Sequence, residues 1–189
     1  MRVIAGKLRS RRLRSLRGAD IRPTSDRLRE TLFNVLTAGN PDALKGSVWL
    51  DLYAGTGAVG IEALSRGAGM VFFVESSPTA AGLIAQNLRS LGLETGFRIL
   101  RQEVTRALRT LEAESITADF VFIDPPYQLE NAYRETLSLL SKSKLLGADA
   151  VIAAEHQKKF DLENDLFSLH RYRKLEQGDS VLSFYRKKS

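Results

Sequence analysis

Length, composition and charge narrow the classes of protein that this chain can be. It has 189 residues, 43% of them hydrophobic, which suits one globular domain with its own core. It contains no cysteine, and this excludes disulfides, thiolate metal sites and cysteine nucleophiles. No apolar run of about 18 residues predicts a membrane span, and no apolar stretch follows the basic N-terminus as in a secretory signal. We interpret His156 and His170, which lie far from the motifs below, as ordinary residues, and we expect a cytoplasmic protein without a metal or membrane partner.

The positive charge is concentrated at the N-terminus. The net charge is +6, and residues 1–30 hold ten Lys and Arg against three acidic residues, so the rest of the chain is close to neutral. A cationic segment on a near-neutral body is typical of a protein that binds a polyanion, although a solvated, partly disordered tail would have the same composition. The cations that we expect to contact nucleic acid are Arg2, Lys7, Arg9, Arg11, Arg12, Arg14 and Arg17.

The first predicted elements are a small hairpin and a helix. Residues 3–5 form a short β-type run, and Gly6 with Lys7 suits a turn, so residues 1–22 are predicted to form a basic hairpin extension. Residues 23–189 then form the main domain. Pro23 disfavours helix before it, Thr24 or Ser25 can cap, and apolar residues follow at helical spacing up to Leu36.

From Ser47 onward, predicted strands alternate with predicted helices. Buried-type strands are expected at 48–50, 70–74, 97–100, 120–123 and 150–154, and amphipathic helices between them at 58–66, 78–91, 104–113 and 130–142. Continuous apolar strands between amphipathic helices indicate an α/β fold whose parallel sheet is covered on both faces. Residues 166–174 and 180–186 have no helix between them and predict a C-terminal antiparallel hairpin on the edge of the sheet.

A glycine-rich loop follows the first of these strands. Gly55, Gly57 and Gly60 have the G-x-G-x-x-G spacing, which lets a backbone turn sharply and approach a ligand closely. The pattern alone also fits a nicotinamide dinucleotide site or a tight turn without a ligand. However, Asp51 ends the strand, and its carboxylate would repel a pyrophosphate but pair with the amino group of a methionine moiety. Glu75 ends the next strand, where a carboxylate can accept both hydroxyls of a ribose.

A second motif, Asp124-Pro125-Pro126-Tyr127, ends the fourth strand. Ligands of open α/β sheets bind at the carboxyl ends of strands, so this tetrapeptide is predicted to lie beside the glycine loop. The Asp124 carboxylate and the Pro125 carbonyl can accept hydrogen bonds from an amino group, and Tyr127 offers a face for base stacking. An ordinary Pro-Pro turn is the alternative.

Together these residues carry a resemblance. The glycine loop, Glu75 and the D-P-P-Y tetrapeptide resemble the class I S-adenosylmethionine-dependent amino-methyltransferases. With residues 1–6 (MRVIAG) and 22–34 (RPTSDRLRETLFN), the chain resembles the bacterial small-subunit (16S) ribosomal RNA (guanine-N2)-methyltransferase family over nearly its whole length.

The resemblance implies a Rossmann-like class I methyltransferase fold with a seven-stranded, mostly parallel sheet and an N-terminal hairpin that engages RNA. It further implies S-adenosylmethionine as cofactor and small-subunit ribosomal RNA, in a partly assembled particle, as substrate. It also implies that the R-P-T block lies near the methionine end of the cofactor. The cofactor contacts expected from motif and resemblance are Asp51, Tyr53, Gly55, Thr56, Gly57, Gly60, Glu75, Ser76, Glu103, Val104, Thr24 and Arg27. Two positions depart from the family pattern: Glu103-Val104 stands where Asp or Asn and then Ala are usual, and Gln177 replaces Tyr in the usual Tyr-Gly-Asp.

Other functions share part of this pattern. A DNA or RNA adenine-N6 or cytosine-N4 methyltransferase would have the same motifs, although the DNA enzymes usually carry a larger recognition domain. A protein-glutamine methyltransferase would more often have Asn in place of Asp124. A non-catalytic RNA-binding assembly factor would need neither Glu75 nor Asp124.

Overall fold

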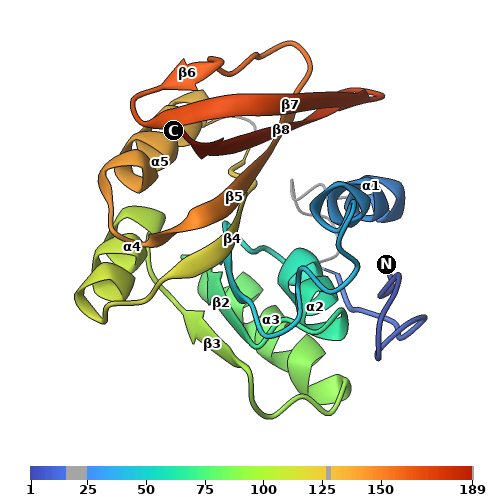
Figure 1. Ribbon diagram of the computed structural model, residues 1–189. Helices are drawn as coiled ribbons and strands as arrows, with labels where there is room; N and C mark the ends of the chain where they lie inside the picture. The colour runs from blue at the N-terminus through green and yellow to red at the C-terminus, as the bar shows by residue number, and fades with distance from the viewer. Residues whose placement is uncertain (16–24, 127–128, 189) are drawn as a thin grey trace.

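The computed structural model describes residues 1–15, 25–126 and 129–188, and these ranges form an α/β fold (Figure 1). The helices are α1 (Asp26–Leu36), α2 (Ala58–Ser65), α3 (Pro78–Ser90), α4 (Val104–Ala113) and α5 (Glu130–Lys142). The strands are β1 (Val48–Leu52), β2 (Met70–Val74), β3 (Phe97–Leu100), β4 (Ala118–Ile123), β5 (Leu146–Gln157), β6 (Asp165–Leu166), β7 (Leu169–Gln177) and β8 (Ser180–Lys187).

The eight strands of the described residues belong to one sheet, in the order β3-β2-β1-β4-β5-β8-β7-β6. The first five strands along the chain pair in parallel, whereas β8 runs antiparallel to both β5 and β7. The order changes direction at β1, so the carboxyl ends of β1 and β4 lie side by side, with Leu52 opposite Ile123. This is the position where open α/β sheets bind ligands.

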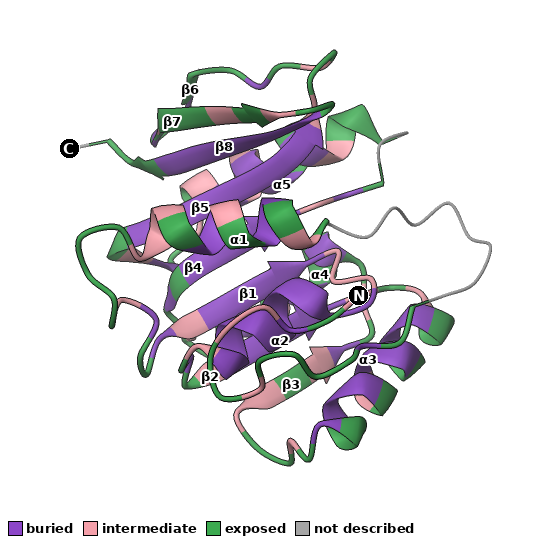
Figure 2. Cartoon of the chain, turned by 90° about the vertical axis from the view of Figure 1, so that its right-hand side faces the viewer, coloured by how far each residue is buried: buried purple, intermediate pink, exposed green. Residues whose placement is uncertain are grey.

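Helices cover both faces of the sheet, as the apolar strands predicted. One core cluster joins α1, α2 and α3 to one face, and a second joins α4 and α5 to the other. Figure 2 shows the first of these layers, with α2 coloured as buried throughout. Every residue of α2 is buried because the N-terminal segment covers the side of the helix that faces away from the sheet.

The prediction of seven strands is wrong, because the sheet has eight. The additional strand, β6, contains only Asp165 and Leu166, and it pairs with the start of β7 across a turn at Phe167. Two residues are too few to produce an alternating pattern, and so the sequence did not mark this strand. The C-terminal antiparallel hairpin was predicted correctly, as β7 and β8.

The described part of the basic extension, residues 1–15, folds back on itself and packs on the main domain. Arg2 and Arg12 form an antiparallel bridge, and the amide of Val3 donates to the carbonyl of Arg11. The Val3 and Leu13 side chains are buried in the same cluster as α1 and α2. The predicted hairpin is therefore present in short form, whereas Arg17 and the remainder of the extension lie outside the described residues.

Helix α1 begins where the sequence predicted. The Ser25 hydroxyl accepts a hydrogen bond from the amide of Leu28 and caps the helix. In the middle of α1, the Thr31 hydroxyl donates a hydrogen bond to the Gln177 side chain at 2.9 Å, which connects the helix to the β7–β8 turn. Among the described residues, no helix is both long and apolar enough to cross a membrane.

Candidate active site

The glycine loop turns sharply between β1 and α2. Gly55 and Gly57 have φ angles of 54° and 75°, in the left-handed region that favours glycine, and the Gly57 amide donates to the Ala54 carbonyl at 2.7 Å. A Cβ on Gly60 would overlap the Phe73 ring and would lie 2.9 Å from Oδ2 of Asp51. The three glycines thus have conformational or steric reasons for being there.

Glu75 holds the loop from the end of β2. One carboxylate oxygen accepts the Gly55 amide and the other accepts the Ser77 amide, both at 2.8 Å. Each oxygen still has a lone pair, because a carboxylate has about four acceptor sites. The side chain is therefore fixed in place and can accept further hydroxyl groups, while Ser76 beside it is exposed.

Asp51 lies beneath the same loop. It is 2% exposed, and its Oδ2 accepts the Gly60 amide at 2.9 Å. Burial raises the pKa of Asp51 to about 8; the hydrogen bond from Gly60 opposes the shift and the nearby charge of Glu75 adds to it. A buried carboxyl of this kind favours a cationic neighbour, since a positive charge would stabilise its ionised form.

The loop also contacts the N-terminal segment. Thr56 is buried, its carbonyl accepts a hydrogen bond from Asn87 at 3.0 Å, and its hydroxyl lies 3.9 Å from the Met1 sulfur. Asn87 was not predicted as a partner of this loop, because Asn87 and Thr56 are 31 residues apart and on different elements.

The D-P-P segment leaves β4 beside this loop. Asp124 is half-buried and Pro125 is buried, whereas Pro126 is exposed. Because β4 pairs with β1, Asp124 follows directly on the strand next to Tyr53. Tyr127 lies outside the described residues, so its predicted stacking role stays a prediction.

A cavity of about 970 Å³ opens at this edge of the sheet. It is lined by residues that follow four strands, among them Tyr53, Glu103, Val104, Pro126, Leu129 and Lys159. Tyr53 is held there by a 2.9 Å hydrogen bond between its hydroxyl and that of Thr136 on α5. Of the predicted adenine contacts, Glu103 precedes α4 and is exposed, whereas Val104 is buried. The volume is within the range of about 300–1,000 Å³ that suits small-molecule sites.

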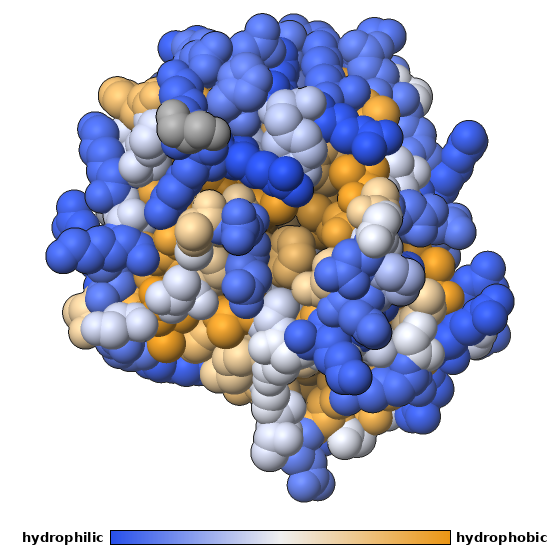
Figure 3. Space-filling view, in the orientation of Figure 1, coloured by the Kyte–Doolittle hydropathy of each residue, from blue (hydrophilic) through white to orange (hydrophobic). Residues whose placement is uncertain are grey.

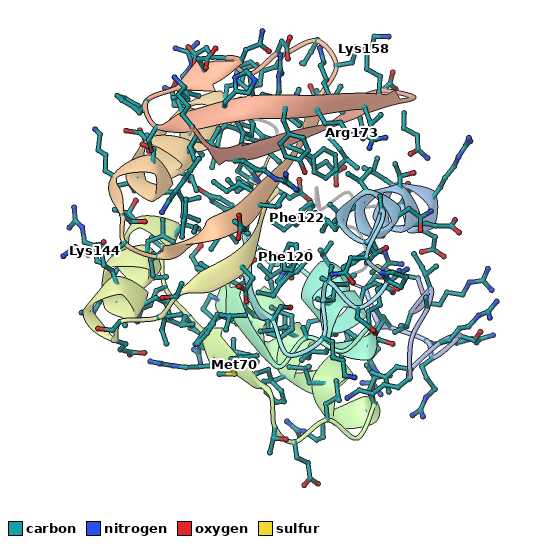
Figure 4. All side chains as sticks on the ribbon, in the orientation of Figure 1. Met70, Phe120, Phe122, Lys144, Lys158 and Arg173 are labelled. Carbon is teal, nitrogen blue, oxygen red and sulfur yellow. The ribbon has the colours of Figure 1, made fainter. Side chains whose placement is uncertain are left out.

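Sequence reasoning missed the part of this cavity beyond β5. Gln157 is the last residue of β5 and Lys159 follows it, and both line the cavity. Figure 4 labels Lys158 in this segment, and Met70 and Lys144 at the opposite edge, where β2 and β5 begin. Their position at the carboxyl end of β5 could have identified them, since ligands of open α/β sheets bind at the carboxyl ends of strands.

The predicted cofactor residues of the R-P-T block are not joined to the site by described contacts. Thr24 lies outside the described residues, and Arg27 is exposed on α1. Arg29, which the sequence did not single out, is fully buried and donates to the Arg2 carbonyl at 2.7 Å and to Asp26 at 2.6 Å. It fastens the N-terminal segment to α1.

The predicted nucleic-acid cations are exposed where they are described. These are Arg2, Lys7, Arg9, Arg11, Arg12 and Arg14, while Arg17 lies outside the described residues. Arg11 donates to the Ser90 carbonyl at 3.1 Å and Arg14 to Gln86 at 3.3 Å, which directs both toward α3. The N-terminal segment therefore presents a cationic surface on the α2 and α3 side of the sheet.

Known proteins are similar to this chain in sequence and in fold. The ribosomal RNA small subunit methyltransferase D of Haemophilus influenzae is 36% identical over 159 residues, which cover 84% of this chain and 79% of that protein. The structure of yhhF from Escherichia coli has a TM-score of 0.83 and 28% identity, covering 100% of this chain and 98% of that one. SMU.776, solved as a complex with S-adenosylhomocysteine (SAH), is 14% identical with a TM-score of 0.65, over 88% of this chain and 50% of that one, so it supports the fold alone.

The family model described as conserved hypothetical protein 95 matches residues 1–186. This match and the relative at 36% identity confirm the family predicted from the sequence. The chain therefore belongs to the conserved hypothetical protein 95 family and has the Rossmann-like fold of the S-adenosylmethionine-dependent methyltransferases.

Proposed function

We propose that this protein transfers a methyl group from S-adenosylmethionine to the exocyclic N2 of a guanine in small-subunit ribosomal RNA. The observation that carries the proposal is the position of Asp124 and Pro125, which follow β4 directly beside the glycine loop that follows β1. A methyl donor at the loop and an amino group at Asp124 would then lie at one edge of the sheet. The Haemophilus influenzae relative is named as a small-subunit ribosomal RNA methyltransferase, and this similarity supports the substrate class.

The residues of the loop fit S-adenosylmethionine. Glu75 is held by two amides and retains acceptor capacity for ribose hydroxyls. Asp51 is a buried carboxyl that favours a cation, and the methionine end of this cofactor carries an ammonium group. A pyrophosphate beside Asp51 would, in contrast, oppose the ionisation of this buried carboxyl, which argues against a nicotinamide dinucleotide. When bound, the cofactor supplies a methyl group on a positively charged sulfonium. This sulfur is a good leaving group, because it becomes a neutral thioether when the methyl group is transferred.

The amino group of guanine is a poor nucleophile because its lone pair is delocalised into the ring. The Asp124 carboxylate and the Pro125 carbonyl can accept its two hydrogens and favour a tetrahedral nitrogen, which frees the lone pair. Pro125 and Pro126 fix the backbone at this turn and bring no amide donor of their own to it. The nitrogen–methyl bond forms as the sulfur–methyl bond breaks, and the amine proton leaves to Asp124 or to water.

The exposed cations of residues 2–14 support an RNA substrate. They belong to one short segment, in which Arg11 and Arg14 contact α3, and they are suited to phosphate contacts because the rest of the chain is close to neutral. A base must leave its stack to reach Asp124, so an unpaired or looped guanine in a partly assembled particle is the substrate that we propose.

Transfer of labelled methyl to small-subunit particles from a strain lacking this gene tests the proposal. Nucleoside analysis of the product should give N2-methylguanosine. N6-methyladenosine as the main product, or label in glutamine of a protein, would overturn it. A cofactor-binding measurement with SAH and NADH separates the two cofactor classes, and only SAH should bind.

A further inference from the structure

The C-terminal β7–β8 hairpin is a second region of net positive charge, separate from the N-terminal segment. Its residues 169–187 include five Lys and Arg against two acidic residues. In Figure 3, hydrophilic side chains gather over the upper part of this face, where Figure 1 has β7 and β8, above an apolar area at its centre.

Two arginines of the hairpin lie on the side of the sheet that carries α1. Arg173 pairs with Phe184 across the two strands, and residues directly opposite one another point to the same face. Phe184 is in the core cluster that contains α1, so Arg173 lies on that side, where Figure 4 labels it. Arg186 is two residues beyond Phe184 on β8 and therefore shares its face.

Tyr172, which precedes Arg173 on β7, supports the guanidinium of Arg186. It lies at the bulge of β7, is 38% exposed and has its ring centroid 6.2 Å from that of Phe184. The guanidinium of Arg186 lies over the Tyr172 ring at 4.5 Å. A stacked guanidinium keeps its N–H edge free to donate while its planar face is covered, so less side-chain entropy is lost when it binds a phosphate.

Within the part of the chain that the structure describes, the two arginines differ from their neighbours in having no carboxylate partner. On the opposite face of the hairpin, Arg171 and Lys174 both pair with Asp161, at 2.6 and 3.1 Å. Neither Arg173 nor Arg186 forms an ion pair with any residue in the described ranges. Their positive charge is therefore available to an external anion.

We propose that Tyr172, Arg173 and Arg186, the hairpin patch, bind the phosphate backbone of an unpaired segment of the RNA substrate. This rests on the proposed function and extends it by a second contact surface. The hairpin patch and the N-terminal segment lie on the same side of the sheet, with α1 between them (Figure 1). Arg173 is five residues before the turn at Gly178, roughly 17 Å along the strand. A single RNA strand that crosses α1 would contact both surfaces, and an exposed tyrosine that supports an arginine is suited to unpaired RNA.

The test compares two double variants that each lose two positive charges. R173A/R186A removes the cations of the hairpin patch, and R106A/R109A removes two exposed arginines from α4, on the other side of the sheet. Binding to small-subunit particles from a strain lacking this gene is measured over a range of salt concentrations. R173A/R186A should lower the slope of log affinity against log salt by about 1.4, since each phosphate contact with a single strand contributes about 0.7. Its KM for the particles should rise about tenfold with kcat unchanged at saturation, while R106A/R109A should behave as wild type.

The outcomes distinguish this inference from the proposed function. If R173A/R186A binds and methylates the particles as wild type does, the hairpin patch is not an RNA contact and the proposed function stands. An equal loss in both double variants would show a general effect of net charge and would also overturn the inference. If wild-type protein transfers no methyl to the particles, the proposed function fails, and the salt slopes alone then decide whether the hairpin patch binds RNA. R173K/R186K, which keeps the charges, should retain most of the slope.

Discussion

Asn87 holds the backbone of Arg14 by both of its polar groups. Its side-chain oxygen accepts the Arg14 amide at 2.9 Å, and its side-chain nitrogen donates to the Arg14 carbonyl at 3.2 Å. The same nitrogen donates to the carbonyl of Thr56 in the glycine loop at 3.0 Å, and the Asn87 side chain is fully buried. One amide group thus joins the cationic N-terminal segment to the proposed cofactor loop.

Replacement of Asn87 should therefore affect both surfaces. Asn87→Ala leaves three backbone groups without their partner, so we expect a loss of about 1–3 kcal/mol in the free energy of unfolding, with weaker binding of both SAH and RNA. Gln86→Ala is the matched control, because Gln86 is on the same helix as Asn87 and its loss removes only an exposed contact to the Arg14 guanidinium. Urea unfolding and calorimetry measure the two effects, and unchanged affinity for SAH would show that the loop does not depend on Asn87.

Gly60 is predicted to tolerate no side chain. In Gly60→Ala the new methyl group would meet the Phe73 ring and Asp51, which are both held in the core, so the protein should lose about 1–3 kcal/mol of stability. Gly82→Ala on α3 has no atom within 4 Å of its new Cβ and should gain up to about 1 kcal/mol from helix propensity. Thermal melts of the two variants should move in opposite directions; a shift of the same sign in both would contradict the packing argument.

Asp51 predicts a specific dependence of stability on pH. Its pKa is raised to about 8 in the folded protein, against about 3.9 in an unfolded chain. Between these values the folded state binds a proton that the unfolded state has released, so the stability from this group falls as pH rises from about 4 to about 8. Relative to Asp51→Asn, which does not titrate, the wild type should lose about 1 kcal/mol per pH unit in this window and no more above it. Parallel curves of unfolding free energy against pH for the two proteins would rule out the raised pKa.

Asp124 is predicted to act on the amine rather than on the cofactor. Asp124→Ala should abolish methyl transfer in a single-turnover assay while leaving the affinity for SAH within about threefold of wild type. Asp119→Ala is a suitable control, because Asp119 lies near the start of the same strand and accepts the Val48 amide at 2.8 Å, far from the proposed site. A near-normal rate of the Asp124 variant at saturating cofactor would remove it from the mechanism.

The parts of this protein that were predicted from the sequence are those encoded locally. A buried strand, a glycine turn and a helix cap each depend on a few consecutive residues. The core of β1, the loop at Gly55 and Gly57 and a cap at Thr24 or Ser25 were therefore predicted, and the structure has the cap at Ser25. Parallel pairing then followed from the alternation of strands and helices.

The contacts that were not predicted depend on distant residues. Glu62 accepts the amides of Ile4 and Ala5 from 58 and 57 residues away, and Asn87 reaches Arg14 across 73. Neither residue has a local pattern that sets it apart on its helix. From the sequence alone, the cations of the hairpin patch were treated as part of a near-neutral body. Only the strand register shows that Arg173 lies on a different face from Arg171 and Lys174, which form ion pairs.

Modification mapping in cells tests the central claim most directly. Mass spectrometry of small-subunit ribosomal RNA is compared between wild type, a strain lacking this gene and that strain carrying either the intact gene or Asp124→Ala. We predict that one N2-methylguanosine disappears on deletion, returns with the intact gene and does not return with the variant. An unchanged set of N2-methylguanosines in the deletion strain, or restoration by Asp124→Ala, would contradict the proposed activity.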